Sequence, residues 1–198
     1  MKKLVVVLGL LLLVPCLAFA QASYFVDYYA NNPGPVPTGF DQVVRIVNVG
    51  LGGTPLTSPV GDICVNIYVF DNNQEMIACC SERITPNELD SASVGNQLTS
   101  NPVTSVVPAA GVIKIGTTAA GAGACDPRTV DLTTASTSFA VVFGTHLQVT
   151  GGATFLTETE KLSSPLSTVE ASFLTTACSF ARYLGSGKGI CTSTFPGH

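Results

Sequence analysis

The sequence predicts a mainly β fold, a single-domain β-sandwich of immunoglobulin-like or similar type, with one C-terminal α-helix. Three observations lead to this class. Short runs rich in β-branched and aromatic residues are broken by Gly and Pro, which is typical of strands and turns. The regular spacing of these runs favours a sandwich or barrel. Near the C-terminus, the apolar residues change to helical spacing.

The strand candidates are short apolar or alternating segments between turn-forming residues. Residues 23–29 are aromatic and form the first candidate, and residues 42–49 carry apolar side chains on both faces, which indicates a central strand. The clearest hairpin joins residues 62–70 to residues 74–80 through an Asx-type turn at Asp71. The further candidates are residues 98–107, 112–115, 138–149 and 153–157.

A single helix is predicted after residue 164. Ser164 is a candidate N-cap, Pro165 suits the first helical position, and Gly185 is a suitable C-terminal end. The apolar stripe at helical spacing consists of Leu166, Val169, Phe173, Ala177, Phe180 and Leu184, widened by Leu174 and Ala181.

The first 20 residues have the features of a cleavable signal peptide. Lys2 and Lys3 precede an apolar stretch that is shorter than a membrane-spanning helix needs. Small residues then lead to a predicted cleavage between Ala20 and Gln21. Cys16 follows Pro15 rather than a small residue, which argues against a lipid-attachment site. We therefore predict a secreted or cell-surface protein, periplasmic or extracellular.

The expected organisation follows from these elements. Residues 1–20 are the signal peptide, and residues 21–39 are an N-terminal strand followed by a Pro-rich connector. Residues 40–160 form the β-sandwich, and residues 161–198 add a helix and a disulfide-clipped tail to the same domain. Cleavage leaves seven basic and 13 acidic residues, which disfavours binding to nucleic acid or anionic membranes. No membrane span is expected after cleavage.

Six cysteines remain after cleavage, and an even number in an exported domain predicts disulfides. Adjacent side chains on a strand point to opposite faces, so Cys79 and Cys80 should have different partners. A pair between Cys178 and Cys191 would fold the tail onto the helix. A three-residue hairpin turn would place Cys64 opposite Cys80, which would leave Cys79 for Cys125. The connectivity otherwise stays open for Cys64, Cys79, Cys80, Cys125, Cys178 and Cys191.

No residue is assigned a catalytic, cofactor-binding or metal-binding role. His146 lies in a predicted strand without a Gly-x-Ser-x-Gly elbow elsewhere, so it is interpreted as a surface or hydrogen-bonded strand histidine. Residues 185–189 resemble a phosphate loop but follow a helix instead of preceding one. Residues 71–75 are read as a turn rather than a calcium loop. The acidic pairs at residues 88–90 and 158–160 are interpreted as solvated loop charges.

Several segments together resemble a group of small secreted bacterial proteins of unassigned function. They are YVFDNNQE at residues 68–75, the adjacent cysteines at 79 and 80, and GSGKGIC at residues 185–191. The resemblance covers most of the mature chain. It implies a shared secreted, cysteine-containing fold and no activity.

These observations lead to two hypotheses about function. The first is a non-catalytic structural or cell-surface protein, including a subunit of an extracellular assembly or filament. Its first strand would pair within its own domain or complete a neighbouring copy by strand addition. The alternative is a soluble binding module for a glycan or surface partner, with Tyr28, Tyr29 and Phe195 as candidate aromatic contacts. An enzyme is the third-ranked class, because no activated nucleophile is evident.

Overall fold

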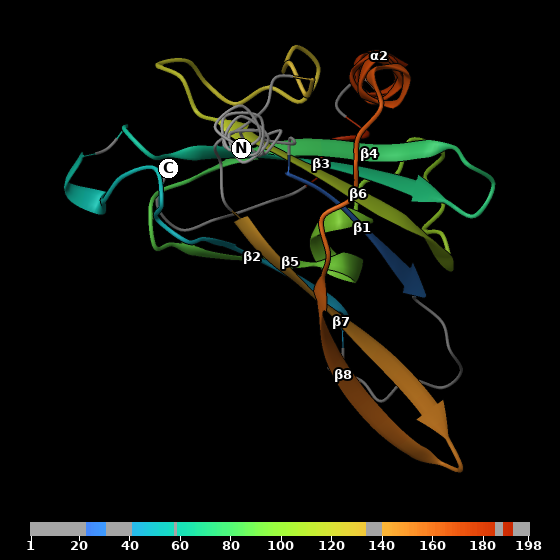
Figure 1. Cartoon of the computed structure of the whole chain (residues 1–198). Coiled ribbons are helices and arrows are strands. Elements are labelled where there is room, and N and C mark those ends of the chain that lie inside the picture. The colour runs from blue at the N-terminus through green and yellow to red at the C-terminus, as the bar shows by residue number, and fades with distance from the viewer. Residues whose placement is uncertain (1–22, 31–40, 58, 134–139, 185–187, 192–198) are drawn as a thin grey trace, which may run out of the picture.

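The structure is a computed structural model that describes residues 23–30, 41–57, 59–133, 140–184 and 188–191. Two four-stranded antiparallel sheets form a sandwich-like arrangement, which confirms the predicted mainly β class (Figure 1). Sheet A has the order β1 (Ser23–Ala30), β6 (Ala110–Ala119), β3 (Ile63–Asp71) and β4 (Met76–Ile84). Sheet B has the order β5 (Leu89–Ser93), β2 (Val43–Asn48), β7 (Ala140–Thr150) and β8 (Ala153–Lys161).

The main core lies between the two sheets. Strand β2 is central in sheet B, as predicted, and its inward side chains Val44 and Ile46 are buried. They pack with inward residues of sheet A, including Ile67 and Ile113. Alternation along each strand places these residues on one face, so the two inner faces share one apolar layer.

Two predictions about the strands need correction. Residues 98–107 were expected to form a strand, but the π-helix η2 (Val94–Leu98) ends there and turns follow. Asn101 and Pro102 interrupt that segment, and the backbone carbonyl of Asn101 accepts the N–H of Gly189. Strand β5 was missed because residues 88–90 carry two acidic side chains that suggest a loop. A short 3-10 helix, η1 (Pro55–Thr57), lies in the loop after β2.

The first strand pairs within its own domain. All eight residues of β1 are in antiparallel register with β6, from Ser23 opposite Thr117 to Ala30 opposite Ala110. Of the two arrangements considered for this strand, the structure has the intramolecular one. The Pro-rich connector lies outside the described residues, as do the signal peptide, the predicted cleavage at Ala20 and Gln21, and Phe195.

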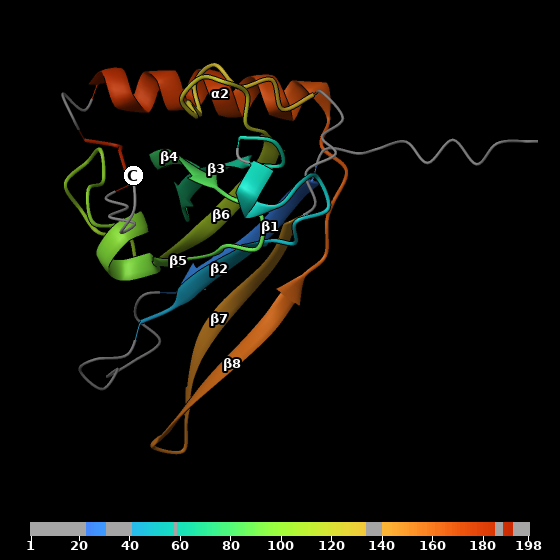
Figure 2. The same ribbon diagram turned by 90° about the vertical axis from the view of Figure 1, so that its left-hand side faces the viewer.

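Helix α2 (Thr168–Leu184) covers the outer face of sheet A (Figure 2). Its buried stripe consists of Ala171, Leu174, Cys178 and Ala181, which pack on β3 and β4 residues such as Tyr68 and Met76. Three residues predicted to lie in the buried stripe are instead exposed: Val169 is 79% exposed, Phe173 47% and Phe180 64%. Three of the four residues in the buried stripe are small, which lets the helix approach the sheet closely, and Leu174 fills the space between them.

The helix also begins later than predicted. The hydroxyl of Ser167 accepts the backbone N–H of Glu170 at 3.1 Å, which is the arrangement of an N-cap. The N–H of Ser164 instead donates to the carbonyl of Tyr24 at 2.7 Å and ties the incoming chain to β1. Among the described residues, no helix combines the length and apolar character needed to cross a membrane.

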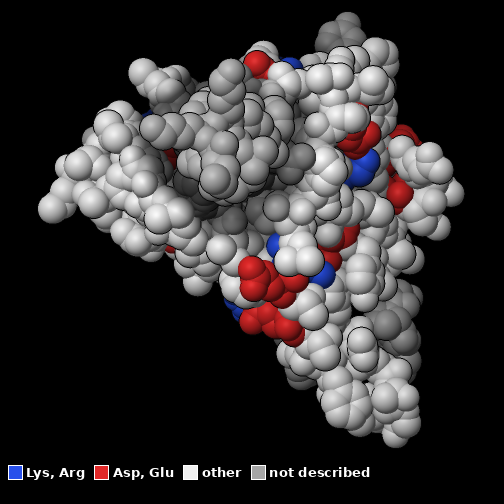
Figure 3. All heavy atoms as spheres, in the orientation of Figure 1, with Lys and Arg blue, Asp and Glu red and all other residues white. Residues whose placement is uncertain are grey.

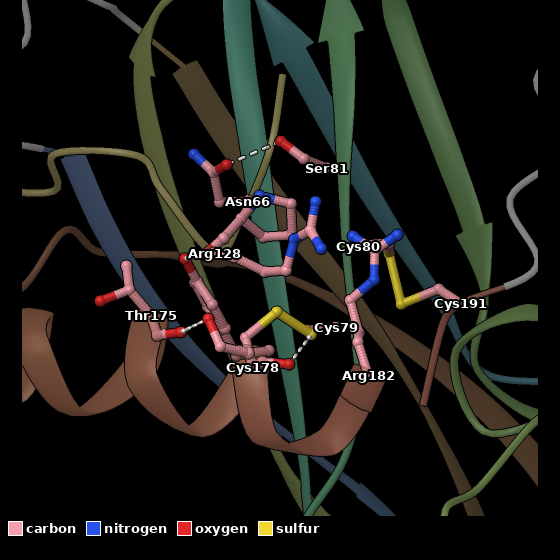
Figure 4. Close-up of a disulfide and its surroundings, with 12 residues drawn as sticks. Asn66, Cys79, Cys80, Ser81, Arg128, Thr175, Cys178, Arg182 and Cys191 are labelled. Carbon is pink, nitrogen blue, oxygen red and sulfur yellow. Dashed lines mark hydrogen bonds between the residues drawn. A yellow bond between two sulfur atoms is a disulfide. The ribbon is translucent and has the colours of Figure 1, made fainter. Parts of the chain in front are cut away.

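The six cysteines from Cys64 to Cys191 all form disulfides, as predicted, but the expected pairs were wrong. The bonds are Cys64–Cys125, Cys79–Cys178 and Cys80–Cys191. Cys178 faces the sheet from the buried stripe of α2, so it meets Cys79 on the outer face of β4 instead of Cys191 (Figure 4). The tail crosses beside β4, where the N–H of Cys79 donates to the carbonyl of Gly189, and Cys191 reaches Cys80.

The hairpin register explains why Cys64 does not meet Cys80. A turn at residues 71–73 would align the two cysteines, but the loop between β3 and β4 spans residues 72–75, so it begins one residue later and is one residue longer, and the pairing is irregular between Val69 and Phe70. Cys64 therefore lies opposite Arg83, and Cys80 opposite Ile67. The expectation that Cys79 and Cys80 take different partners is confirmed.

Candidate functional site

The β7–β8 hairpin projects from the sandwich (Figures 1 and 2). Its strands run in unbroken antiparallel register from Val142 opposite Lys161 to Thr150 opposite Ala153. The two residues between them, Gly151 and Gly152, have φ values of 57° and 79°. A two-residue turn with both φ angles positive matches the right-handed twist of the strands, and glycine adopts it without strain.

Strand β8 exposes apolar side chains on both faces of this hairpin. Phe155 and Leu156 are neighbours in sequence, so they point to opposite faces, and each is 50% exposed. Across the pair, Leu156 lies opposite Leu147 and Phe155 opposite Gln148. A hairpin of two strands has little stability of its own, so apolar residues on both of its faces indicate a surface suited to contact.

Strand β8 is also a long edge strand. In sheet B it has β7 as its hydrogen-bonded neighbour and none on the other side among the described strands. The edges of sheet A are partly covered, because Ser164 bonds to β1 and the tail forms a bridge between Ile190 and Cys79 of β4. Strand β5, the other edge of sheet B, has five residues against nine in β8. Long uncovered edges are where sheets accept another strand.

Charged side chains gather at the base of the hairpin, whereas its tip carries none on the visible face (Figure 3). Arg45 of β2 forms an ion pair with Glu158 of β8 and donates to the hydroxyl of Thr145 at 3.0 Å. The acidic residues 158–160 therefore lie on a strand rather than on the predicted loop, and Glu158 is paired across the sheet. The edge is polar at its base and apolar nearer the turn.

A buried cluster of Asp27, His146 and Lys161 lies where the hairpin meets the first strand. Asp27 is 4% exposed and His146 is 6% exposed. His146 is therefore not a surface residue, which was one of the two predicted environments for it. Oδ1 of Asp27 lies 2.8 Å from Nζ of Lys161 and 3.2 Å from Nε2 of His146. The cluster joins β1 of sheet A to β7 and β8 of sheet B.

The contacts of His146 place its Nε2 between a donor and an acceptor. This atom lies 2.8 Å from Nζ of Lys161 and 3.2 Å from Oδ1 of Asp27, so its role depends on the tautomer of the ring. In the tautomer in which Nε2 accepts from Lys161, the ring proton is on Nδ1, which is buried and has no hydrogen-bond partner among the described residues. Burial lowers the pKa of His146, Asp27 opposes this, and Lys161 adds to it. The ring is thus a neutral base held against an amine.

Two further residues shape this cluster. The ring of Tyr28 stacks on His146 with centroids 4.2 Å apart, and Tyr28 is 55% exposed, so it covers the cluster from the solvent side. Gly144 of β7 provides space, because a Cβ atom there would lie 1.9 Å from Oδ2 of Asp27. The cluster is therefore enclosed by an aromatic lid and a glycine.

The sequence contains a signal for this cluster that was not used. Phe25, Asp27 and Tyr29 alternate on one face of a strand, and both aromatic residues are buried. Asp27 therefore had to enter the interior and needed a partner.

The structure does not place the tyrosines of the glycan hypothesis on an open surface. Tyr29 is 1% exposed and donates to the carbonyl of Phe70, while Tyr28 covers His146. The described residues do not bring these tyrosines into one exposed patch.

The remaining predicted features have structural roles. Oδ1 of Asp71 accepts the N–H groups of Asn73 at 2.9 Å and Glu75 at 2.8 Å, which confirms the Asx turn.

Asp90 is buried on β5, and no well-formed hydrogen bond reaches its carboxylate from the described residues. Burial raises the pKa of Asp90 to about 7, and Glu82 adds to the effect. Within the described ranges, no cluster of three or more His, Cys, Asp or Glu residues could hold a metal ion.

Comparison with known proteins gives little further information. No family model matches the chain, and no curated protein matches it. The crystal structure of Thermotoga maritima 1070 is similar at 12% sequence identity and a TM-score of 0.41, covering 74% of this chain and 98% of that chain.

Proposed function

We propose that the mature chain is an exported, non-catalytic structural or cell-surface protein that works by contact, as a subunit of an extracellular assembly of its own copies. The observation that carries this proposal is the projecting β7–β8 hairpin with a nine-residue edge strand and exposed Phe155 and Leu156. Three disulfides suit an oxidising, extracytoplasmic compartment. The resemblance to small secreted bacterial proteins points the same way.

The hairpin geometry defines which backbone groups of β8 are available. In a two-residue hairpin, the residues that flank the turn form a hydrogen-bonded pair, and such pairs alternate along the strands. Thr150 and Ala153 are this first pair, so odd-numbered residues of β8 direct their N–H and C=O groups at β7. Leu156, Glu158 and the other even-numbered residues direct these groups away from β7, toward the open edge.

A second copy of β8 fits this edge in antiparallel orientation. Full overlap places Thr157 on the two-fold axis, with Leu156 opposite Glu158 and Thr154 opposite Glu160 as hydrogen-bonded pairs. Ala153 then lies opposite Lys161, and no like charges face each other directly. A parallel, in-register arrangement would place Glu158 opposite Glu158 and Glu160 opposite Glu160, which is unfavourable. The antiparallel dimer therefore agrees with both hydrogen bonding and charge.

Such a dimer would extend sheet B of one copy into sheet B of the next and cover part of Phe155 and Leu156. A non-catalytic role is supported by the burial of the His146 cluster. Its side chains are at most 13% exposed, so a diffusing substrate has poor access to them. The proposed role thus depends on the surface of the hairpin and not on chemistry at its base.

The test is the oligomeric state of the mature protein, measured by sedimentation velocity and light scattering over a range of concentrations. We expect wild type to associate and Leu156→Pro to be monomeric, because proline removes an edge N–H that β7 does not use. Leu156→Ala is the matched control; it keeps that N–H and should weaken association only in part. Wild type that stays monomeric at high concentration would overturn the proposal and favour a soluble binding module.

A further inference from the structure

The first and last strands of the sandwich belong to different sheets and meet at one pair of side chains. Asp27 of β1 and Lys161 of β8 place a carboxylate oxygen and an amine nitrogen 2.8 Å apart. The side chains are 3% and 13% exposed. An ion pair this deeply buried loses most of its hydration, which its mutual attraction has to offset.

The reaction begins with a proton transfer inside this pair. Transfer of one proton from Nζ of Lys161 to the carboxylate of Asp27 leaves a neutral amine beside a neutral carboxylic acid. A neutral amine is a nucleophile, and a protonated carboxyl has a leaving group that can depart as water.

His146 is placed to move the protons that such a reaction requires. Its Nε2 lies 2.8 Å from Nζ of Lys161 and 3.2 Å from Oδ1 of Asp27, so a single ring nitrogen contacts both partners. In the neutral tautomer that carries its proton on Nδ1, Nε2 can accept a proton from the amine and pass it to the carboxyl oxygen. The stacked ring of Tyr28 covers His146 and limits the access of water.

We propose that Lys161 and Asp27 form an intramolecular isopeptide bond between β8 and β1. The lone pair of Nζ attacks Cγ of Asp27, and the Nζ–Cγ bond forms. The protons lost by Nζ pass through Nε2 of His146 to a carboxyl oxygen, whose bond to Cγ breaks as water leaves. The reaction joins an amine and an acid and releases one water, so no oxidant, reductant or co-reactant is needed.

Three features of the protein favour this reaction over a persistent ion pair. The fold holds the two reacting groups in contact, which removes the entropic cost of bringing them together. Gly144 leaves room for the carboxyl group, since a Cβ atom there would also lie 2.6 Å from Cε of Lys161. The product replaces two buried charges by an amide. This bond would fasten sheet A to sheet B at the base of the projecting hairpin and goes beyond the proposed self-association.

The test is the intact mass of the mature protein after full reduction and denaturation. We expect wild type to be lighter than its sequence mass by one water, and its digest to contain a branched peptide that links residues 27 and 161. Lys161→Arg and Asp27→Ala should each have the full sequence mass. His146→Phe keeps a ring against Tyr28 and should leave most molecules unlinked.

Two outcomes would overturn the proposal. One is wild type of full sequence mass without a linked peptide, in which case the three residues form an ion-pair network. The other is a water loss that persists in Lys161→Arg, which would place the modification elsewhere, for example in a cyclised aspartate. Because the wild-type measurement decides by itself, variants that fail to fold do not leave the question open. The oligomeric state is measured separately and is independent of this result.

Discussion

Asp90 allows a quantitative prediction about stability and pH. It lies on β5 opposite Ile46, is 5% exposed, and has a pKa raised to about 7 by burial first and by Glu82 second. An unfolded chain would return this carboxyl to its ordinary value of 3.8. The folded protein therefore keeps a proton on Asp90 over a pH range in which the unfolded chain has lost it.

The sign of the effect follows from this difference. Below pH 4 both states hold the proton, and Asp90 has no effect on the pH dependence. Between about pH 4 and pH 7 the unfolded chain binds fewer protons, so the free energy of unfolding falls as pH rises, and it levels off above pH 7. A tenfold change in proton affinity is worth about 1.4 kcal/mol, so the total loss is at most about 4 kcal/mol.

The perturbation is Asp90→Asn, which keeps the shape of the side chain and cannot ionise. We expect the variant to match wild type near pH 4 and to be more stable than wild type at pH 8, by up to about 4 kcal/mol. Urea unfolding at a series of pH values, with the disulfides intact, measures this difference. Glu75→Gln, in the exposed β3–β4 loop, is the matched control. Parallel curves for Asp90→Asn and wild type from pH 4 to pH 8 would refute the reasoning.

Two further predictions concern covalent and steric constraints. Replacing Cys79 and Cys178 together by Ala opens a loop with a sequence separation of 99 and should lower stability by about 2–4 kcal/mol, less than an isolated loop of that size because two other bonds remain. An unchanged Tm would contradict a stabilising role for this bond. Gly144→Ala places a methyl group against Asp27 and should cost about 1–3 kcal/mol, whereas Gly121→Ala, with nothing within 4 Å, should be neutral in the same thermal scans.

The parts of the fold that the sequence predicts well have local causes. The β3–β4 hairpin follows from alternating apolar residues and from Asp71, whose carboxylate orders the turn. Strand β2 follows from apolar residues on both faces of one segment. These features need no knowledge of distant residues. The β3–β4 loop nevertheless begins one residue later and is one residue longer than expected, which moves the residue opposite Cys64 from Cys80 to Arg83.

The parts that were mispredicted depend on tertiary packing. Helix α2 has two apolar faces. The face with Phe173 and Phe180 carries larger side chains than the face with Ala171 and Cys178, so the sequence pattern favoured the first as the buried face. The bond from Cys178 to β4 selects the small face. The cluster at the base of the hairpin depends on which strands of opposite sheets meet. Periodicity places Asp27 inside but does not name Lys161 as its partner.

The neighbouring cysteines of β4 have a consequence for biogenesis. In a chain exported from its N-terminus, as proposed, Cys79 and Cys80 would emerge 99 and 111 residues before their partners Cys178 and Cys191. During that interval the two adjacent thiols would lack their native partners. A premature bond would join them to Cys64 or Cys125, which precede Cys178 in the sequence. Efficient maturation should therefore depend on an isomerase that acts after translocation, and truncated chains should be held in mixed disulfides.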